Sequence, residues 1–160
     1  MSILVDTDRG PGTPFPPTML FVLGFLVALW INRAVPLDIG GPDLETLRIG
    51  AGLVALFGGT ALFWWGMATF AGRTGILLQR PARQLVTSGP YQYSRNPMYV
   101  GFVAMYFGLS LLLNTVWPLL VLPAIIALLV WIVISREERY MRATFGDEYL
   151  AYCRRVRRWL

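Results

Sequence analysis

Long uncharged stretches alternate with short polar segments along this chain of 160 residues. No Asp, Glu, Lys or Arg occurs at residues 10–32, 49–72 or 96–135. Because a helix needs about 20 apolar residues to cross the core of a bilayer, each of the first two stretches can cross it once. The third stretch, 40 residues long, would extend about 60 Å as one helix, twice the thickness of that core, so it must fold back as two spans. The pattern therefore predicts four membrane-spanning helices.

Proline and polar residues mark where these helices begin and end. Pro97 opens the third span, and Asn114 with Thr115 forms a tight turn between the third and the fourth. We therefore predict an all-α polytopic membrane protein that forms a single membrane-embedded domain over residues 1–160. The predicted spans lie at about residues 18–34, 49–70, 97–113 and 116–135, with a loop at 71–96 and a tail at 136–160.

The second predicted span carries a stripe of small residues. Ala51, Ala55 and Gly59 recur at every fourth position and so share one face of a helix. This spacing is typical of helices that pack closely in membranes. We expect that face to contact another span.

The arginines give the predicted orientation, since the chain has 14 of them and no lysine. Four spans place the N-terminus, the loop and the tail on one side with twelve arginines, and leave Arg33 and Arg48 on the other. By the positive-inside rule both termini, the loop and the tail are cytosolic. The rule holds in the plasma or inner membrane and in the endoplasmic reticulum, and of these we favour the plasma or inner membrane.

Composition excludes several classes of protein. Hydrophobic residues make up 56% of the chain and charged residues 14%, where a soluble domain has about 25% charged residues, and the mean hydropathy is +0.55. The net charge of +5 could suit nucleic acid, but no basic soluble domain is present, so we predict no nucleic-acid partner. One cysteine and no histidine exclude a disulfide framework, histidine-ligated metal and histidine-based catalysis, and we predict no metal site.

The tail has a helical periodicity of its own. Over residues 147–160, Tyr149, Cys153, Val156 and Leu160 fall on one side of a helix, and four arginines cover the other. A basic amphipathic helix of this kind suits an anionic membrane surface, whereas a solvated run of charge is the simpler alternative. We predict a cytosolic amphipathic helix that docks on the membrane.

Two groups of residues could carry chemistry. In the first, three tyrosines and Arg95 surround Asn96, which can cap the third span, and a helix N-terminus can bind an anion. An interfacial aromatic belt is the structural alternative. In the second, Glu137 and Glu138 follow the longest uncharged stretch, and they could either bind a ligand or pair with the arginines beside them on the helix.

Together the two groups resemble the isoprenylcysteine carboxyl methyltransferase family, and the related phospholipid N-methyltransferases share much of the pattern. The resemblance covers about residues 84–160, nearly half of the chain. It rests on GPYxxxRNPMYxG at residues 89–101, then a predicted helical hairpin, and then Glu137-Glu138, Phe145-Gly146, Tyr149 and Tyr152.

This resemblance implies an integral-membrane methyltransferase that uses S-adenosylmethionine bound in a cytosolic pocket. The acceptor would be a lipophilic or membrane-associated molecule with a carboxylate, amine or thiol, so the expected partners are such a substrate and the bilayer. We expect direct in-line methyl transfer, and we place Arg95, Tyr99 and Glu137 as catalytic residues. Carried over residue by residue, the cofactor contacts fall on Arg83, Gln84, Leu85, Val86, Tyr91, Asn96, Pro97, Met98, Tyr99, Glu137 and Glu138.

The chemistry of these residues agrees with that assignment. The glutamates suit the ammonium group or the ribose diol of the cofactor, and the tyrosines can flank its adenine or its sulfonium. We expect the tail to fold back over the pocket as a seal between the cytosol and the bilayer.

The chain departs from the family in two places. Asn96 stands where many members have histidine, and Val133 stands where the eukaryotic enzymes have a substrate-contacting arginine. These departures leave the acceptor open, and the sequence carries no signal for an oligomeric state. Two alternatives remain: an NADPH-dependent membrane reductase of the sterol or steroid type, and a non-catalytic small membrane protein.

Overall fold

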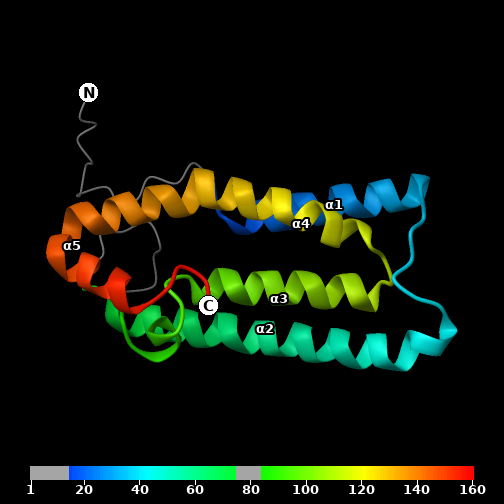
Figure 1. Cartoon of the computed structure of the whole chain (residues 1–160), viewed down its shortest axis with the longest axis horizontal. Helices are drawn as coiled ribbons and strands as arrows, with labels where there is room; N and C mark the ends of the chain where they lie inside the picture. The colour runs from blue at the N-terminus through cyan, green and yellow to red at the C-terminus, as the bar shows by residue number, and fades with distance from the viewer. Residues whose placement is uncertain (1–14, 75–83) are drawn as a thin grey trace.

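The structure, a computed structural model, describes residues 15–74 and 84–160, and within them it is helical and contains no strand. α2 and α3 lie side by side, and α1 packs along α4, so that the bundle has two pairs of helices (Figure 1). The predicted all-α class is confirmed for the described residues. The main helices are α1 (Thr18–Ala34), α2 (Glu45–Thr74), α3 (Pro97–Leu112), α4 (Trp117–Leu128) and α5 (Ser135–Arg155), and the short 3₁₀ turns are η2 (Pro42–Leu44) and η3 (Gly89–Gln92).

Two of these helical segments are long and apolar enough to cross a membrane. They are Pro42–Ala71 and Trp117–Arg155, and the second has a mean hydropathy of 2.7 in its most apolar window. α1 and α3 are apolar helices of 17 and 16 residues. The bounds of α1 agree with the predicted first span, and α3 ends one residue before the predicted third span does.

The helix of the fourth predicted span continues past residue 135. A π-helical turn at Leu129–Ile134 joins α4 to α5, so one helical rod extends through both (Figure 1). The Ser135 hydroxyl donates a hydrogen bond of 2.6 Å to the carbonyl of Val130, five residues earlier, inside this wider turn. The rod bends at Gly146, whose φ of 49° breaks the helix and redirects the end of α5 toward α2 and α3.

Glycines set the close packing of α2 on α3. Gly52, Gly59 and Gly66 recur every seven residues on α2 and are buried. On α3, Gly108 lies opposite Gly52, Gly101 opposite Gly59, and Met98 opposite Gly66. A Cβ atom on Gly59 would lie 2.6 Å from the carbonyl oxygen of Gly101, so neither helix could approach as closely with larger residues.

The predicted stripe of small residues is therefore wrong in its register. Gly59 belongs to the interface, but Ala51 is exposed. The small residues that contact α3 are the glycines that recur every seven residues. Alanine and glycine are both small, so residue size alone did not distinguish this spacing from the predicted spacing of four.

The predicted turn between the third and fourth spans is confirmed. Asn114 has a φ of 51°, and its side-chain oxygen accepts hydrogen bonds of 3.2 Å from the backbone of Ile39 and of Gly40. Nearby, the Arg48 guanidinium donates to the carbonyl of Leu112 at 3.1 Å and so caps the C-terminus of α3. These contacts fix the end of the bundle that lies opposite to the candidate site.

Candidate active site

The loop before α3 is shaped by a glycine that no other residue could replace without strain. Gly89 has a φ of +60°, and a Cβ atom there would lie 2.9 Å from the hydroxyl of Thr69 on α2. η3 follows, with Pro90 and Tyr91 buried, and Pro97 then occupies the first position of α3 as predicted. The loop is thereby held against the end of α2, and it delivers the first turn of α3 to the site.

Asn96 does not cap α3 with its side chain, contrary to the prediction. It occupies the N-cap position, but its side-chain amide donates a hydrogen bond of 3.0 Å to the carbonyl of Arg158. The Ser94 hydroxyl accepts a hydrogen bond of 3.1 Å from the backbone of Asn96 and donates one of 3.3 Å to the same Arg158 carbonyl. The long-range partner has displaced the local cap, because the carbonyl of Arg158 needs donors of its own.

The first turns of α3 and α5 meet through Tyr99 and Glu137. The Tyr99 hydroxyl donates to Glu137 Oε1 at 2.9 Å. Burial raises the pKa of Glu137 to about 7; the hydrogen bond from Tyr99 opposes this shift, and the charge of Glu138 adds to it. A carboxylate that titrates near neutral pH, beside an aromatic hydroxyl, is equipped to bind a cationic ligand.

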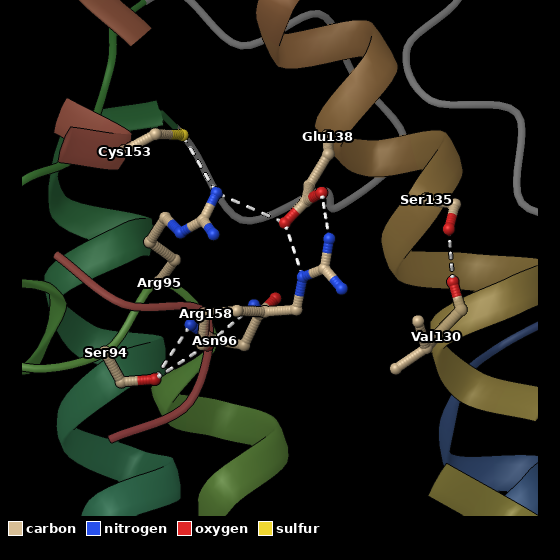
Figure 2. A network of polar contacts seen from close by, with 8 residues as sticks. All are labelled: Ser94, Arg95, Asn96, Val130, Ser135, Glu138, Cys153 and Arg158. Carbon is tan, nitrogen blue, oxygen red and sulfur yellow. Dashed lines mark hydrogen bonds and ion pairs between the residues drawn. The ribbon is translucent and has the colours of Figure 1, made fainter. Parts of the chain in front are cut away.

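Glu138 points to a different set of partners. Arg158 donates from Nε and Nη2 to its two carboxylate oxygens at 2.8 and 2.7 Å, and Arg95 Nη1 lies 3.2 Å from Oε1 (Figure 2). The pKa of Arg158 is raised, because its hydrogen bonds to Glu138 and the negative charge of Glu138 stabilise the protonated guanidinium. Glu138 therefore pairs with arginines from two distant segments and not, as in the structural alternative, with the arginines beside it on the helix.

Tyr91 presents a buried hydroxyl to the same region. Its oxygen finds no hydrogen-bond partner within residues 15–74 and 84–160, and burial, with the nearby Tyr152 and Glu137, raises its pKa. The backbone carbonyl of Tyr91 accepts a hydrogen bond of 2.7 Å from the Tyr152 hydroxyl. Since buried polar atoms are nearly always paired in proteins, this hydroxyl is available to a ligand.

The apolar side of the predicted tail helix is buried against protein. Tyr149, Tyr152 and Val156 pack on Leu85 of the loop before η3, and the helix ends at Arg155 rather than at residue 160. Leu160 is 72% exposed. The expectation that this face rests on the membrane is therefore wrong for all but the last residues. The tail does fold back onto the loop, and its role as a seal over the pocket stays a prediction.

The predicted site residues are distributed unequally. Five polar residues gather where the loop, α3 and α5 meet, at one end of the bundle, and this group includes the predicted catalytic residues: Tyr91, Arg95, Tyr99, Glu137 and Glu138. Gln84 is exposed, Leu85 and Val86 are buried, and Met98 packs over Gly66 of α2. Arg83 lies outside the described residues.

Sequence reasoning missed the inward contact of Arg158 and one contact of Cys153. Arg158 was placed on the solvent side of a basic helix, yet it turns inward to Glu138. Cys153 packs with the apolar side of the tail, where the helical periodicity placed it, and it also accepts a hydrogen bond of 2.8 Å from Arg95 Nη1 (Figure 2). No local signal distinguishes Arg158 from the arginines around it, because its partner is 20 residues away and the chain between them bends.

Two known proteins are similar to parts of this chain. The chain is 37% identical over 76 residues to the protein-S-isoprenylcysteine O-methyltransferase of Schizosaccharomyces pombe, an alignment that covers 45% of this chain and 30% of that protein. An uncharacterized protein of Haemophilus influenzae is 59% identical over 27 residues, which cover 17% of this chain and 43% of that protein. The chain thus spans less than half of the length of either relative. No solved structure gives a significant match.

A family-level match extends further than either pairwise alignment. Residues 47–148 match the phospholipid methyltransferase family, and this range holds nearly all of α2, all of α3, the GPYxxxRNPMYxG motif and both glutamates. The resemblance predicted from the two motifs is confirmed. Because the match covers more than half of the chain, the protein belongs to the phospholipid methyltransferase family.

Proposed function

We propose that the protein is an integral-membrane methyltransferase that transfers the methyl group of S-adenosylmethionine to a lipophilic or membrane-associated acceptor. The observation that carries this proposal is the meeting of the two motifs at one place, where Tyr99 at the start of α3 donates to Glu137 at the start of α5 at 2.9 Å. The S. pombe relative is itself named as an O-methyltransferase of isoprenylcysteine, which supports a lipophilic acceptor.

The residues at this place fit the chemical groups of S-adenosylmethionine. Glu137 supplies a carboxylate for the ammonium group or the ribose diol, and the unpartnered hydroxyl of Tyr91 supplies a further polar contact. When bound, the cofactor supplies an activated methyl group on a cationic sulfur. Tyr99 fixes the carboxylate through its hydrogen bond, and the buried loop residues exclude water from the reacting atoms.

An apolar cavity supports the lipophilic nature of the acceptor. It has a volume of about 290 Å³ and lies between α1 and α3, where Phe21, Phe25, Phe102 and Tyr106 contribute to its wall. Tyr99 lies on the same helix, seven residues before Tyr106, or about 10 Å along the axis. A hydrocarbon chain in this cavity would therefore extend toward the methyl-transfer site.

The decisive experiment uses purified protein, methyl-labelled S-adenosylmethionine and a total lipid extract. We expect saturable binding of S-adenosylmethionine and label in a lipid-soluble product, whose identification reveals the acceptor. NADPH, the cofactor of the alternative reductase, is not expected to compete for binding. Saturable binding of NADPH without any binding of S-adenosylmethionine would replace this proposal by the reductase, and binding of neither would leave a non-catalytic protein.

We also propose that the chain crosses the membrane four times, with the candidate site on the cytosolic side. The twelve-to-two division of arginines motivates this orientation. In a Cys153→Ser background, a cysteine at exposed Asp43 should react with a membrane-impermeant maleimide in intact cells, and one at exposed Arg155 only after permeabilisation. The four-span topology places an odd number of crossings between these two positions, so the two cysteines should lie on opposite sides of the membrane. Reaction of both from the same side would contradict that topology.

A further inference from the structure

Three segments that are distant in the sequence converge on Glu138. The first is the loop at residues 94–96, the second is the start of α5, and the third is the extended strap of residues 156–160 that follows α5. Arg95 and Arg158 both reach the Glu138 carboxylate, and Figure 2 shows their guanidinium groups on either side of it. We call this arrangement the clasp.

The backbone strengthens the clasp independently of the ion pairs. The Arg95 amide donates to the carbonyl of Arg157 at 3.0 Å, and the carbonyl of Arg158 accepts from the side chains of Ser94 and Asn96. The strap therefore holds the loop immediately before α3 by three hydrogen bonds, while the Arg158 side chain holds the start of α5.

Both carboxylate oxygens of Glu138 are engaged in this arrangement. Oε1 receives Arg158 Nε and lies near Arg95, and Oε2 receives Arg158 Nη2. The side chain of Glu138 is only 16% exposed. A carboxylate already paired with two guanidinium groups has little capacity left for a ligand's ammonium group, whereas Glu137, one residue earlier, pairs with a neutral hydroxyl.

We propose that Arg158 is a positioning residue of the methyl-transfer site and that Glu138 anchors it, rather than binding the cofactor. This inference rests on the proposed function. Arg158 links the loop that precedes Tyr99 to the helical turn that carries Glu137, so it fixes the distance between these two residues without touching the cofactor. A displacement of about 1 Å between two such groups can reduce activity about a hundredfold.

A double-mutant cycle on binding of S-adenosylmethionine tests this proposal. We expect Arg158→Gln and Glu138→Gln each to raise the Kd about tenfold, and the double variant to raise it by no more than about twofold beyond either single change. Arg158→Lys keeps the charge but loses the bidentate contact with Glu138, so it should bind more weakly than the wild type and more tightly than Arg158→Gln. Arg155→Gln is the matched control, because Arg155 is an exposed arginine at the end of α5 outside the clasp.

The rate of alkylation of Cys153 reports on the clasp without any cofactor. The Cys153 sulfur is held by Arg95, and it is the single cysteine of the chain. Arg158→Gln should accelerate its alkylation severalfold, and Arg155→Gln should not. If Arg158→Gln does not yield folded protein, Glu138→Gln and Arg158→Lys take its place, and the alkylation rate of Cys153 in each is compared with that in Arg155→Gln.

The outcomes separate the clasp from the proposed function. If the double variant raises the Kd by the product of the two single effects, Glu138 and Arg158 act independently. That result, or a much larger increase in Kd for Glu138→Gln than for Arg158→Gln, would make Glu138 a direct ligand and overturn the clasp. Normal binding by Arg158→Gln, or an unchanged alkylation rate, would overturn only the role of Arg158. Absence of S-adenosylmethionine binding by the wild type would overturn the proposed function, and the role of Arg158 with it.

Discussion

Replacement of Gly59 by alanine is expected to lower the free energy of unfolding by about 2 kcal/mol and to reduce methyl transfer. A methyl group at this position would lie 2.6 Å from the Gly101 carbonyl oxygen and 2.8 Å from the backbone nitrogen of Met105. Backbone atoms cannot rotate out of the way as a flexible side chain can, so α2 and α3 must separate. Because α3 carries Tyr99 in its first turn, their separation should also disturb the site. Thermal unfolding in detergent measures the first effect, and the labelled-lipid assay measures the second.

Gly58 provides the matched control on the same helix. A Cβ atom there meets nothing within 4 Å, and alanine favours a helix over glycine by up to about 1 kcal/mol. Gly58→Ala should therefore unfold at the wild-type temperature or above it. Equal unfolding temperatures for the Gly58 and Gly59 variants would show that α2 and α3 do not approach as closely as this packing requires.

The positions of the apolar helices could be predicted from the sequence because charge is excluded from most of their length. The uncharged stretch at residues 10–32 contains all of α1 except its last two residues, and Pro97 marks the first residue of α3 by its missing amide hydrogen. The faces of the helices were harder to predict. In an apolar helix almost every side chain is compatible with lipid, so the hydrophobic pattern does not indicate which face meets protein, and only the heptad of glycines carried that signal.

The tail shows why an amphipathic pattern does not determine what covers its apolar face. Tyr149, Tyr152 and Val156 suit a membrane surface and a protein surface equally well. The bend at Gly146 decides between them, because it turns this face onto Leu85 and brings the strap back to the loop. A glycine at that position was visible in the sequence, but the direction of the bend was not.

The candidate site was predictable as a set of residues but not as a set of contacts. The two motifs identified Tyr99 and Glu137, which lie on different helices and form a hydrogen bond. The sequence assigned both Glu137 and Glu138 to the cofactor, because adjacent residues of a helix differ only by a rotation of about 100°. In the structure that rotation separates a glutamate that pairs with a tyrosine from one that pairs with Arg95 and Arg158.

The affinity for S-adenosylmethionine is expected to rise about tenfold between pH 5.5 and pH 7, because only the ionised form of Glu137 attracts a cation. Its pKa of about 7 means that most molecules carry a protonated Glu137 at the lower pH. This range lies below the pH at which the α-amino group of a ligand titrates, so the protein supplies the change. Glu137→Gln should weaken binding about ten- to a hundredfold at pH 7 and remove the pH dependence. Equilibrium binding at several pH values measures both effects.

The stability of the ligand-free protein should change with pH in the opposite direction. The pKa of Glu137 is raised in the folded protein from an ordinary value of 4.5, so its contribution to stability is fully present below about pH 4.5 and is lost as the pH rises through about 7. The same protonation equilibrium therefore weakens the fold where it strengthens cofactor binding, and Glu137→Gln should remove both dependences. Glu148→Gln, on the exposed side of α5, should retain both. If Glu137→Gln instead binds S-adenosylmethionine as the wild type does at every pH, Glu137 does not face the cofactor, and its hydrogen bond with Tyr99 serves only to join α3 to α5.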